Sequence, residues 1–221
     1  DRLQHGGVLP MVTSCSPGWV NMCELKYPDL LPHLSTAKSP QGMFGAVIKT
    51  YWAEKANVNP AKIVSVSVMP CIAKKAECVR PQLRDSGFQD VDIVITTREL
   101  GKMLREDGID FTRLPDAEFD SPLGFGSGAG AIFGTTGGVM EAALRTVADV
   151  VTVQDIQQVD YKAVRGFEET KEAVLNIAGK EVKIDVCNTL GSAMKMMDRV
   201  RAGTADYHFI EVMACPGGCI G

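Results

Sequence analysis

Three segments of this 221-residue chain carry cysteine in or beside a turn, and they constrain the fold more than any other feature. Each combines cysteine with serine, proline or glycine, residues that favour tight loops. The segments are 13–17, 69–74 and 213–219, and their cysteines are Cys15, Cys71, Cys215 and Cys219. Seven cysteines in all is an odd number for a disulfide framework, and the loop cysteines are unevenly spaced. The pattern therefore favours thiolate chemistry over crosslinking.

Four thiolates suit two kinds of metal site. A cubane iron-sulfur cluster needs four cysteines that converge from loops, whose backbone wraps the cluster and donates N–H groups to its sulfurs. A structural zinc site also takes four thiolates, but it usually uses two closely spaced pairs. Here only Cys215 and Cys219 are close in sequence, bracketed by Pro216, Gly217 and Gly218. The spacing favours the iron-sulfur cluster, with zinc as the alternative, although any one of these cysteines taken alone fits a small apolar core residue equally well.

The rest of the chain alternates strand and helix patterns, which predicts an α/β fold with parallel strand pairs. Ser39 and Pro40 are typical of a helix start, and the β-branched run 63–69 predicts a strand that ends just before Cys71. Further strands are expected at 92–97, at 207–213 and in a hairpin over 172–188 that turns at Gly179-Lys180. Further helices are expected at 18–32, 98–107, 134–147 and 190–202. No repeat or linker divides the chain, so we expect one domain over 1–221.

Composition and charge exclude several classes of function. The 23 basic and 27 acidic residues give a net charge of −4, which offers no basic surface for nucleic acid or anionic membranes. No apolar run approaches the roughly 20 residues that span a bilayer, and the first residues show no secretory signal. The glycine-rich stretch 124–138 lacks the lysine of a phosphate-binding loop. We therefore expect a soluble protein with no nucleic-acid partner and no membrane span.

The three cysteine segments resemble the signature segments of the FeFe (iron-only) hydrogenases. The family patterns are Thr-Ser-Cys-(Cys or Ser)-Pro-Gly-Trp, Met-Pro-Cys-x-x-Lys-x-x-Glu and Glu-x-Met-x-Cys-x-x-x-Cys-x-Gly. Here they run from Thr13 to Trp19, from Met69 to Glu77 and from Glu211 to Gly221. The stretches 38–41 and 127–144 also match in order and spacing, so the resemblance covers essentially the whole chain.

The resemblance implies a two-lobed α/β fold in which each lobe has a mostly parallel sheet flanked by helices and the cofactor is buried between the lobes. That cofactor is the H-cluster, a 4Fe-4S cubane joined through a cysteine thiolate to a two-iron subcluster with CO, cyanide and a bridging azadithiolate. Cys71, Cys215 and Cys219 would be cubane ligands, with Cys219 as the bridge to the two-iron unit. The implied reaction is the reversible combination of protons and electrons to H2.

Roles for other residues follow from the same resemblance. Lys74 would contact a cyanide, because an ammonium beside an anionic ligand makes a charge-assisted hydrogen bond. Ser35 would belong to the proton pathway. Four residues are expected to line the cofactor: Met69, Met213, Gln41 and Phe133. The two methionines would keep water out.

The first cysteine segment departs from the commonest family form, which has two adjacent cysteines. The first of that pair relays protons to the bridging amine and the second ligates the cubane, whereas here the pair is Cys15-Ser16. A direct overlay makes Cys15 the relay and puts Ser16, a harder and more basic donor, in the position of a ligand. If the loop is shifted instead, Cys15 ligates iron, and Ser16 or water relays the proton. We expect Cys15 to be essential in either arrangement.

The resemblance also implies partners. Ferredoxin or another electron-carrier protein or subunit would exchange electrons in a ferredoxin- or NAD(P)-linked reaction, and maturation proteins would supply the two-iron unit. Family segments for proton transfer and for cofactor packing fall outside the matching stretch, so we expect a fragment that lacks both ends. We expect a cytoplasmic location, with the periplasm as the alternative. The alternative functions are a non-catalytic cytosolic iron-sulfur assembly factor of the same fold and a hydrogen-sensing relative.

The other cysteines and the histidines fit structural roles. Cys23 and Cys187 are expected in the core, on a helix and a strand, and Cys78 is expected in a loop as a free thiol. The three histidines are dispersed along the chain, which argues against a metal site built from them.

Overall fold

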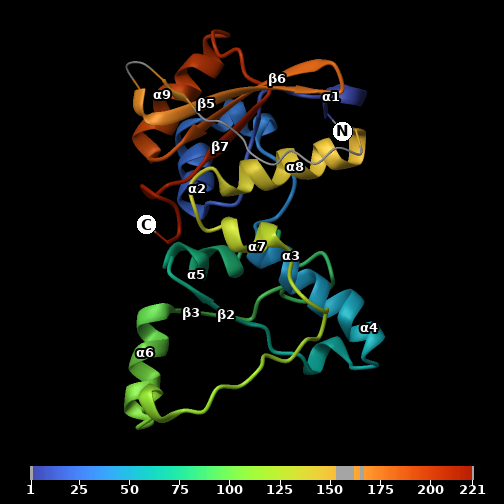
Figure 1. The fold of residues 1–221 in the computed structure, drawn as a ribbon, viewed down its shortest axis with the longest axis vertical. Coiled ribbons are helices and arrows are strands. Elements are labelled where there is room, and N and C mark those ends of the chain that lie inside the picture. The colour runs from blue at the N-terminus through green and yellow to red at the C-terminus, as the bar shows by residue number, and fades with distance from the viewer. Residues whose placement is uncertain (1, 153–161, 165–166, 221) are drawn as a thin grey trace. The chain divides into compact units, whose positions relative to one another are not determined.

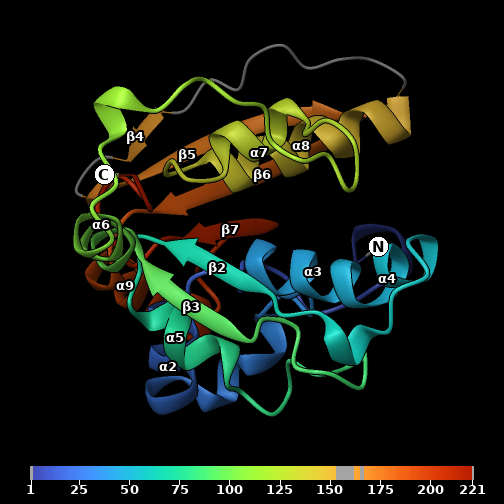
Figure 2. The same ribbon diagram turned by 90° about the horizontal axis from the view of Figure 1, so that it is seen from below.

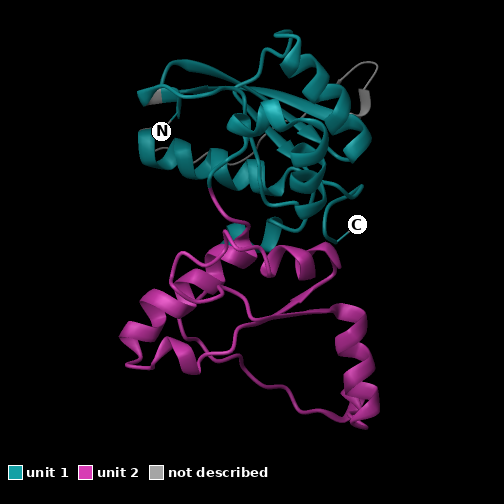
Figure 3. Ribbon diagram, turned by 180° about the vertical axis from the view of Figure 1, so that it is seen from behind, with its two compact units in different colours: residues 1–36, 127–221 teal, residues 37–126 magenta. Residues whose placement is uncertain are grey.

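The chain contains both helices and strands, as the sequence patterns predict (Figure 1). The computed structural model describes residues 2–152, 162–164 and 167–220. The chain forms two compact units: unit 1 combines residues 1–36 with 127–221, and unit 2 is the intervening stretch 37–126 (Figure 3). The expected α/β class with parallel-rich sheets is confirmed. That the chain is a single domain stays a prediction.

Unit 1 is built on a five-stranded sheet. Its strands are β1 (Met11–Val12), β4 (Lys162–Val164), β5 (Phe167–Ile177), β6 (Lys180–Cys187) and β7 (Phe209–Val212). The order across the sheet is β1-β7-β6-β5-β4; the first three are parallel neighbours, and β5 and β4 continue the sheet as antiparallel strands. The expected hairpin is the β5–β6 pair, but its turn is Ala178-Gly179, one residue earlier than the expected Gly179-Lys180; the two turn residues have positive φ, at 51° and 80°. Positive φ at both central residues is what a two-residue hairpin turn of type I′ requires.

Helices cover both faces of this sheet (Figure 2). The longer helices of unit 1 are α2 (Pro17–Lys26), α8 (Gly138–Thr152) and α9 (Leu190–Arg201). On one face, α2 and α9 enclose a core that includes Trp19, Cys23, Met196, Cys187 and Val212. On the other face, α8 packs on β5 and β6 through Met140, Leu144, Ala173, Ile184 and Val186. Shorter helical turns of unit 1 are α1 (Arg2–His5), the 3-10 helix η1 (Pro28–His33) and α7 (Gly128–Ile132).

Unit 2 holds a two-stranded parallel sheet formed by β2 (Val66–Met69) and β3 (Ile93–Thr96). Its helical elements are α3 (Pro40–Val47), the π-helix η2 (Ile48–Trp52), α4 (Ala53–Lys55), η3 (Pro60–Lys62), α5 (Ala73–Cys78), α6 (Thr97–Glu106) and η4 (Phe111–Arg113). The predicted cap is confirmed, since Ser39 Oγ accepts a hydrogen bond from Gly42 N at 3.3 Å and Pro40 opens α3. No helix among the described residues is long and apolar enough to cross a membrane.

Besides the hairpin turn, three expected features differ from the structure. The single helix expected at 18–32 is α2 followed by η1, because Pro28 has no N–H to continue the helical bonds and disfavours helical backbone at Tyr27. The helix expected from residue 134 begins at Gly138. Cys78 is the last residue of α5 rather than a loop residue, and it packs against Val91 and Val94. The core positions expected for Cys23 and Cys187 are confirmed.

Candidate functional site

The segments that carry Cys15 and Cys215 leave the sheet of unit 1 at the same edge. β1 and β7 are parallel neighbours, with Val12 paired to Ile210. Because parallel strands end at the same edge of a sheet, the loops after β1 and β7 begin next to each other. Cys15 lies in the loop after β1, and Cys215 lies in the loop after β7. The strand pairing thus brings two of the four predicted thiols to one edge.

Side chains of the first loop fix the second loop. Thr13 Oγ1 accepts a hydrogen bond from Val212 N at 3.0 Å, and Ser16 Oγ accepts one from Ala214 N at 3.3 Å. The Trp19 indole in turn donates to Thr13 O at 2.9 Å. Thr13, Ser16 and Trp19 are buried. Ser16 therefore has a structural partner directly before Cys215, a contact that the sequence analysis did not foresee.

Residues 215–219, here called the cysteine turn, form a tight turn that depends on two glycines. Gly217 and Gly218 have φ of 75° and 90°, in the left-handed region that favours glycine. Gly218 N donates to Cys215 O at 3.1 Å, and Cys219 N donates to Gly134 O at 2.7 Å. A Cβ on Gly218 would lie 2.4 Å from Gly134 O, so a larger residue would separate the two backbones. The two cysteines at the ends of the turn are held by this tight backbone.

Residues 134–138, here called the glycine turn, form the seat of the cysteine turn. Thr136 N donates to Gly217 O at 3.2 Å, and a bridge pairs Thr135 with Gly218. The Thr136 Oγ1 atom is buried and has no hydrogen-bond partner among the described residues. Leaving such a hydroxyl unsatisfied costs about 1–3 kcal/mol. A cluster sulfur or thiolate beside the turn would accept this bond, so the orphan hydroxyl fits an iron-sulfur group in this place.

In unit 2, the segment of Cys71 follows β2 and leads into α5, which carries Lys74. Lys74 Nζ pairs with Glu77 Oε2 at 2.9 Å and with Oε1 at 3.1 Å, and both side chains are buried. The same carboxylate accepts from Ser39 Oγ at 3.0 Å and from Gln41 Nε2 at 3.2 Å. A buried, multiply bonded ion pair of this kind fixes the position of the ammonium.

The remaining predicted site residues lie in ordinary structural surroundings. Ser35 N donates to Val12 O at 2.7 Å, which anchors this residue beside β1. Met213 is buried directly after β7, whereas Met69 ends β2 and packs on the small core of unit 2. Phe133 follows α7 and is half-buried.

Unit 1 thus holds three of the four predicted cluster thiols, and unit 2 holds Cys71 and Lys74. None of the seven cysteines, all of which lie among the described residues, forms a disulfide. Among the described residues, no three histidine, cysteine or acidic side chains come together in a geometry that holds a metal ion. The donor set and the orphan Thr136 hydroxyl fit an iron-sulfur cluster chemically. The four-cysteine ligand set stays a prediction.

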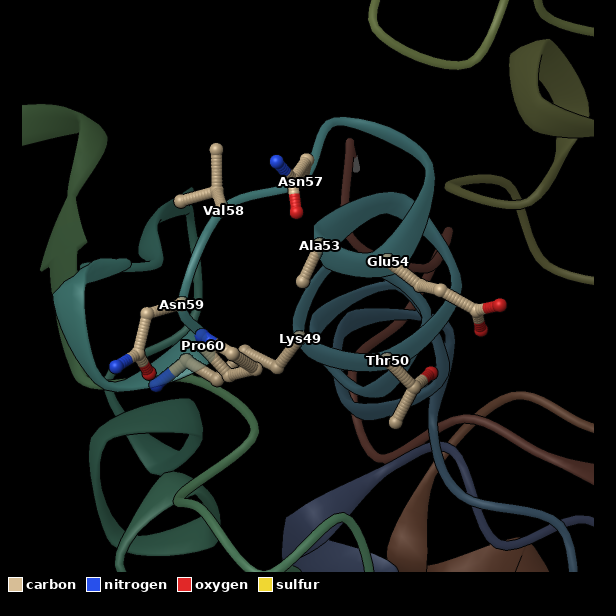
Figure 4. A pocket seen from close by; sticks show the side chains of 8 residues that line it. All are labelled: Lys49, Thr50, Ala53, Glu54, Asn57, Val58, Asn59 and Pro60. Atoms are coloured by element: carbon tan, nitrogen blue, oxygen red, sulfur yellow. The ribbon is translucent and has the colours of Figure 1, made fainter.

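A separate pocket in unit 2 contains no predicted site residue. It lies between the helical segment 49–54 and the stretch 57–60 that follows it (Figure 4). Lys49 lines the pocket, but its ammonium is paired with Asp92 at 2.6 Å. Asp92 Oδ2 also accepts from Ser65 N at 2.7 Å. The lysine at this pocket therefore serves the packing of unit 2.

Glu211 stands in the third cysteine pattern, but its structural role was not predicted from the sequence. Glu211 is fully buried on β7, and its carboxylate accepts hydrogen bonds from Gly137 N at 2.6 Å and Met140 N at 2.7 Å. Burial raises the pKa of this carboxyl, while the two backbone hydrogen bonds lower it. The available signal was an acidic residue within an otherwise apolar strand, since such a residue needs buried partners.

Comparisons with known proteins agree with these features. Residues 1–221 match the family described as the iron only hydrogenase large subunit, C-terminal domain. The chain is 51% identical over 212 residues to the periplasmic [Fe] hydrogenase large subunit of Nitratidesulfovibrio vulgaris, covering 96% of this chain and 50% of that protein. It is 52% identical over 213 residues to the NADP-reducing hydrogenase subunit HndD of Solidesulfovibrio fructosivorans, covering 96% of this chain and 36% of that protein.

Solved structures and more distant relatives extend the comparison. A variant of apo [FeFe]-hydrogenase HydA1 from Chlamydomonas reinhardtii superposes with a TM-score of 0.83 at 41% identity, over 96% of this chain and 61% of that chain. The cytosolic iron-sulfur assembly component 3 of Bos taurus is 34% identical over 220 residues, covering 96% of this chain and 46% of that protein. The chain thus spans half or less of the length of these curated relatives. It belongs to the iron-only hydrogenase large-subunit family, whose C-terminal domain it matches over its whole length.

Proposed function

We propose that this chain is the H-cluster-binding part of an FeFe hydrogenase that interconverts H2 with protons and electrons. The observation that carries the proposal is the cysteine turn, seated on the glycine turn beside the orphan Thr136 hydroxyl. In this proposal Cys71, Cys215 and Cys219 hold the 4Fe-4S cubane, and Cys15 is either the fourth ligand or the proton relay. When bound, the two-iron subcluster with its CO, cyanide and azadithiolate ligands supplies the open iron site for hydrogen chemistry.

The polar network of unit 2 would supply a positioned ammonium donor. Glu77 is held by Ser39 and Gln41, and it in turn holds the Lys74 ammonium. Gln41 Oε1 also accepts from Ser67 Oγ at 2.9 Å, which ties the network to β2. Because the ion pair is buried, water screens its electrostatic interactions poorly. Its side chains are already in place, so little reorganisation is needed when a ligand binds beside them. An ammonium fixed in this way stabilises an anionic ligand such as cyanide.

Protons and electrons would reach the site from partners. A proton relay needs groups within about 2.6–3.2 Å of one another, and Ser35, Cys15 and Ser16 are the candidates on this chain. Electrons would pass to or from ferredoxin or another carrier protein or subunit, and a relative named as NADP-reducing supports an NAD(P)-linked partner. Maturation proteins would deliver the two-iron unit. Relatives are named as periplasmic and as cytosolic, so the cytoplasmic location stays a prediction.

A second candidate function is that of a non-catalytic iron-sulfur assembly factor. A relative at 34% identity, named as an assembly component, covers 96% of this chain and favours this candidate. The hydrogenases at 51–52% identity favour the enzyme. The buried Lys74–Glu77 pair also favours the enzyme, since a scaffold for cubanes needs no partner for cyanide.

Infrared spectroscopy of the full-length protein, matured anaerobically with hydrogenase maturation proteins, tests the proposal. Sharp bands in the CO and cyanide stretching region, together with H2 evolution from a reduced carrier, are the expected result. The matched control is the same protein prepared without the maturation proteins, which should carry the cubane and lack these bands. A matured sample with 4Fe-4S absorption and no CO or cyanide bands would contradict the enzyme and support the assembly factor.

A further inference from the structure

We propose that Glu211 is a positioning residue for the cysteine turn, which it holds in place through the start of α8. The part of this inference that concerns a bound cluster rests on the proposed function. The part that concerns the geometry of the turn does not, because it is argued from contacts within unit 1 alone. Neither part assigns Glu211 a contact with the cofactor.

The Glu211 carboxylate joins β7 to the first turn of α8. Oε1 accepts from Gly137 N at 2.6 Å, and Oε2 accepts from Met140 N at 2.7 Å. Amides at the start of a helix have no partner within the helix, and a carboxylate there also interacts favourably with the helix dipole. Hydrogen bonds to an ionised acceptor are shorter and stronger than neutral ones. The two oxygens therefore fix the start of α8 on the strand.

The backbone that Glu211 binds belongs to the glycine turn and the start of α8, and the glycine turn is hydrogen-bonded to the cysteine turn. Thr136 N donates to Gly217 O at 3.2 Å, and Cys219 N donates to Gly134 O at 2.7 Å. The first amide bound by Glu211 is the one directly after Thr136. β7 leads through residues 213–214 into the cysteine turn. Glu211 therefore connects the strand before the cysteine turn with the glycine turn, to which the cysteine turn is hydrogen-bonded. The Glu211 carboxylate thus helps to fix the backbone that positions Cys215 and Cys219.

A carboxylate is costly at this position, and its two oxygens explain its presence. The other residues of β7 are apolar, and burying a charge is unfavourable unless the charge is paired or hydrogen-bonded. A glutamine has one acceptor oxygen, so it would turn an NH2 group toward the second backbone amide. Glu211→Gln thus keeps the shape of the side chain and removes one of the two bonds. This substitution isolates the positioning role.

Hydrogen exchange in the full-length apo protein is the first test. In E211Q, the Cys219 and Thr136 amides should exchange at least about tenfold faster, a change equivalent to about 1.4 kcal/mol. The matched control is Glu172→Gln on β5, whose carboxylate accepts from the Tyr207 hydroxyl at 3.1 Å. The control should leave exchange in the cysteine turn unchanged. An unchanged rate at Cys219 in folded E211Q overturns the proposal.

Two further variants keep the test decisive if E211Q does not fold, as judged by circular dichroism. Glu211→Asp keeps the charge but shortens the reach, so it should speed exchange at Cys219 in the same direction. Gly218→Ala separates the two turns directly, because its Cβ would lie 2.4 Å from Gly134 O. Faster exchange at Cys219 in G218A but not in E211D would also overturn the role of Glu211.

Cubane reconstitution with iron and sulfide is the second test, and it reads the cluster directly. E211Q should lose iron to a chelator several-fold faster than wild type, and its 4Fe-4S midpoint potential should shift, whereas E172Q should match wild type. An unchanged potential and chelation rate in E211Q would overturn the proposal. If wild type takes up no cluster, the proposed function fails, and the exchange experiment alone still decides the role of Glu211.

Discussion

The Cys187 thiol donates a hydrogen bond to Asp185 Oδ2 across 3.2 Å, and both side chains are fully buried in unit 1. Burial raises the pKa of Asp185 from 3.8 to about 6. The folded state therefore binds more protons than the unfolded state between about pH 4 and pH 6. The free energy of unfolding should fall as pH rises through this window, by about 3 kcal/mol, and stay low above it.

Asp185→Asn should remove this loss of stability. Asparagine cannot ionise, so D185N should be more stable than wild type at pH 8, by up to about 3 kcal/mol, and equal to it near pH 4. Urea unfolding of the full-length apo protein at several pH values measures the difference. The control is Asp206→Asn, whose carboxylate is exposed and whose pKa is lowered by the Lys183 ammonium. A D185N protein with the pH dependence of wild type would contradict this account.

Lys49→Met should destabilise unit 2, because it leaves the Asp92 carboxylate without its cation. The expected loss is about 2 kcal/mol, less than the roughly 3–5 kcal/mol of a fully buried pair since Asp92 is 29% exposed. Chemical denaturation measures it. The same substitution at Lys102, whose pair with Glu106 is exposed, should change stability by under about 0.5 kcal/mol. Equal effects at the two lysines would show that the charge pair at Lys49 is not what matters.

Gly45→Ala should disrupt the packing of α3. A Cβ at this position would lie 2.4 Å from the backbone oxygen of Asp90, so helix or loop must shift, at a cost of about 1–3 kcal/mol. Gly101→Ala in α6 is the matched control, because nothing lies within 4 Å of its Cβ position. That variant should instead stabilise the protein by about 0.5–1 kcal/mol. Thermal unfolding of both variants checks the opposite signs.

Cys15→Ala separates the two roles that the sequence leaves open. We expect H2 evolution to fall at least about 100-fold, because the variant removes either a relay or a ligand. Iron content and the cubane EPR signal distinguish the two, since both persist if Cys15 is a relay and both fall if it is a ligand. Ser16→Ala in the same loop removes the acceptor for Ala214 N and should cost about 1 kcal/mol of stability, in addition to any relay or ligand role of Ser16. Full activity in C15A would contradict both roles.

Thr136→Val should have opposite effects in the apo and cluster-loaded proteins. In the apo protein it removes a buried hydroxyl that has no partner in the described part of the chain, so stability should rise by about 1 kcal/mol. In the loaded protein the hydroxyl would donate to the cluster, so T136V should release iron faster than wild type. Thermal unfolding and chelator kinetics measure the two effects. A T136V protein that is stabilised equally in both states would show that the hydroxyl does not meet the cluster.

Local patterns in the sequence determined much of the fold. The Ser39-Pro40 helix start is found where the short-range pattern places it, and the strand before Cys71 and the β5–β6 hairpin are found within a few residues of their predicted positions. These features depend on residues a few positions apart, whose backbone preferences and hydrogen bonds operate before any tertiary contact forms. The cysteine motifs could likewise be recognised from the sequence, because each is a short run of residues in a fixed order.

Tertiary contacts decided the rest. α8 starts at Gly138 rather than at residue 134 because the glycine turn is bonded to the cysteine turn about eighty residues away in sequence. Ser16 bonds to Ala214 and Glu211 bonds to Gly137, and neither partner can be inferred from neighbours in the chain. Buried polar groups take whatever partner the packed fold brings to them, since leaving them unpaired is costly. Short sequence motifs were therefore enough to predict the candidate site residues. The hydrogen bonds that hold these residues in place exist only once the sheet of unit 1 has formed.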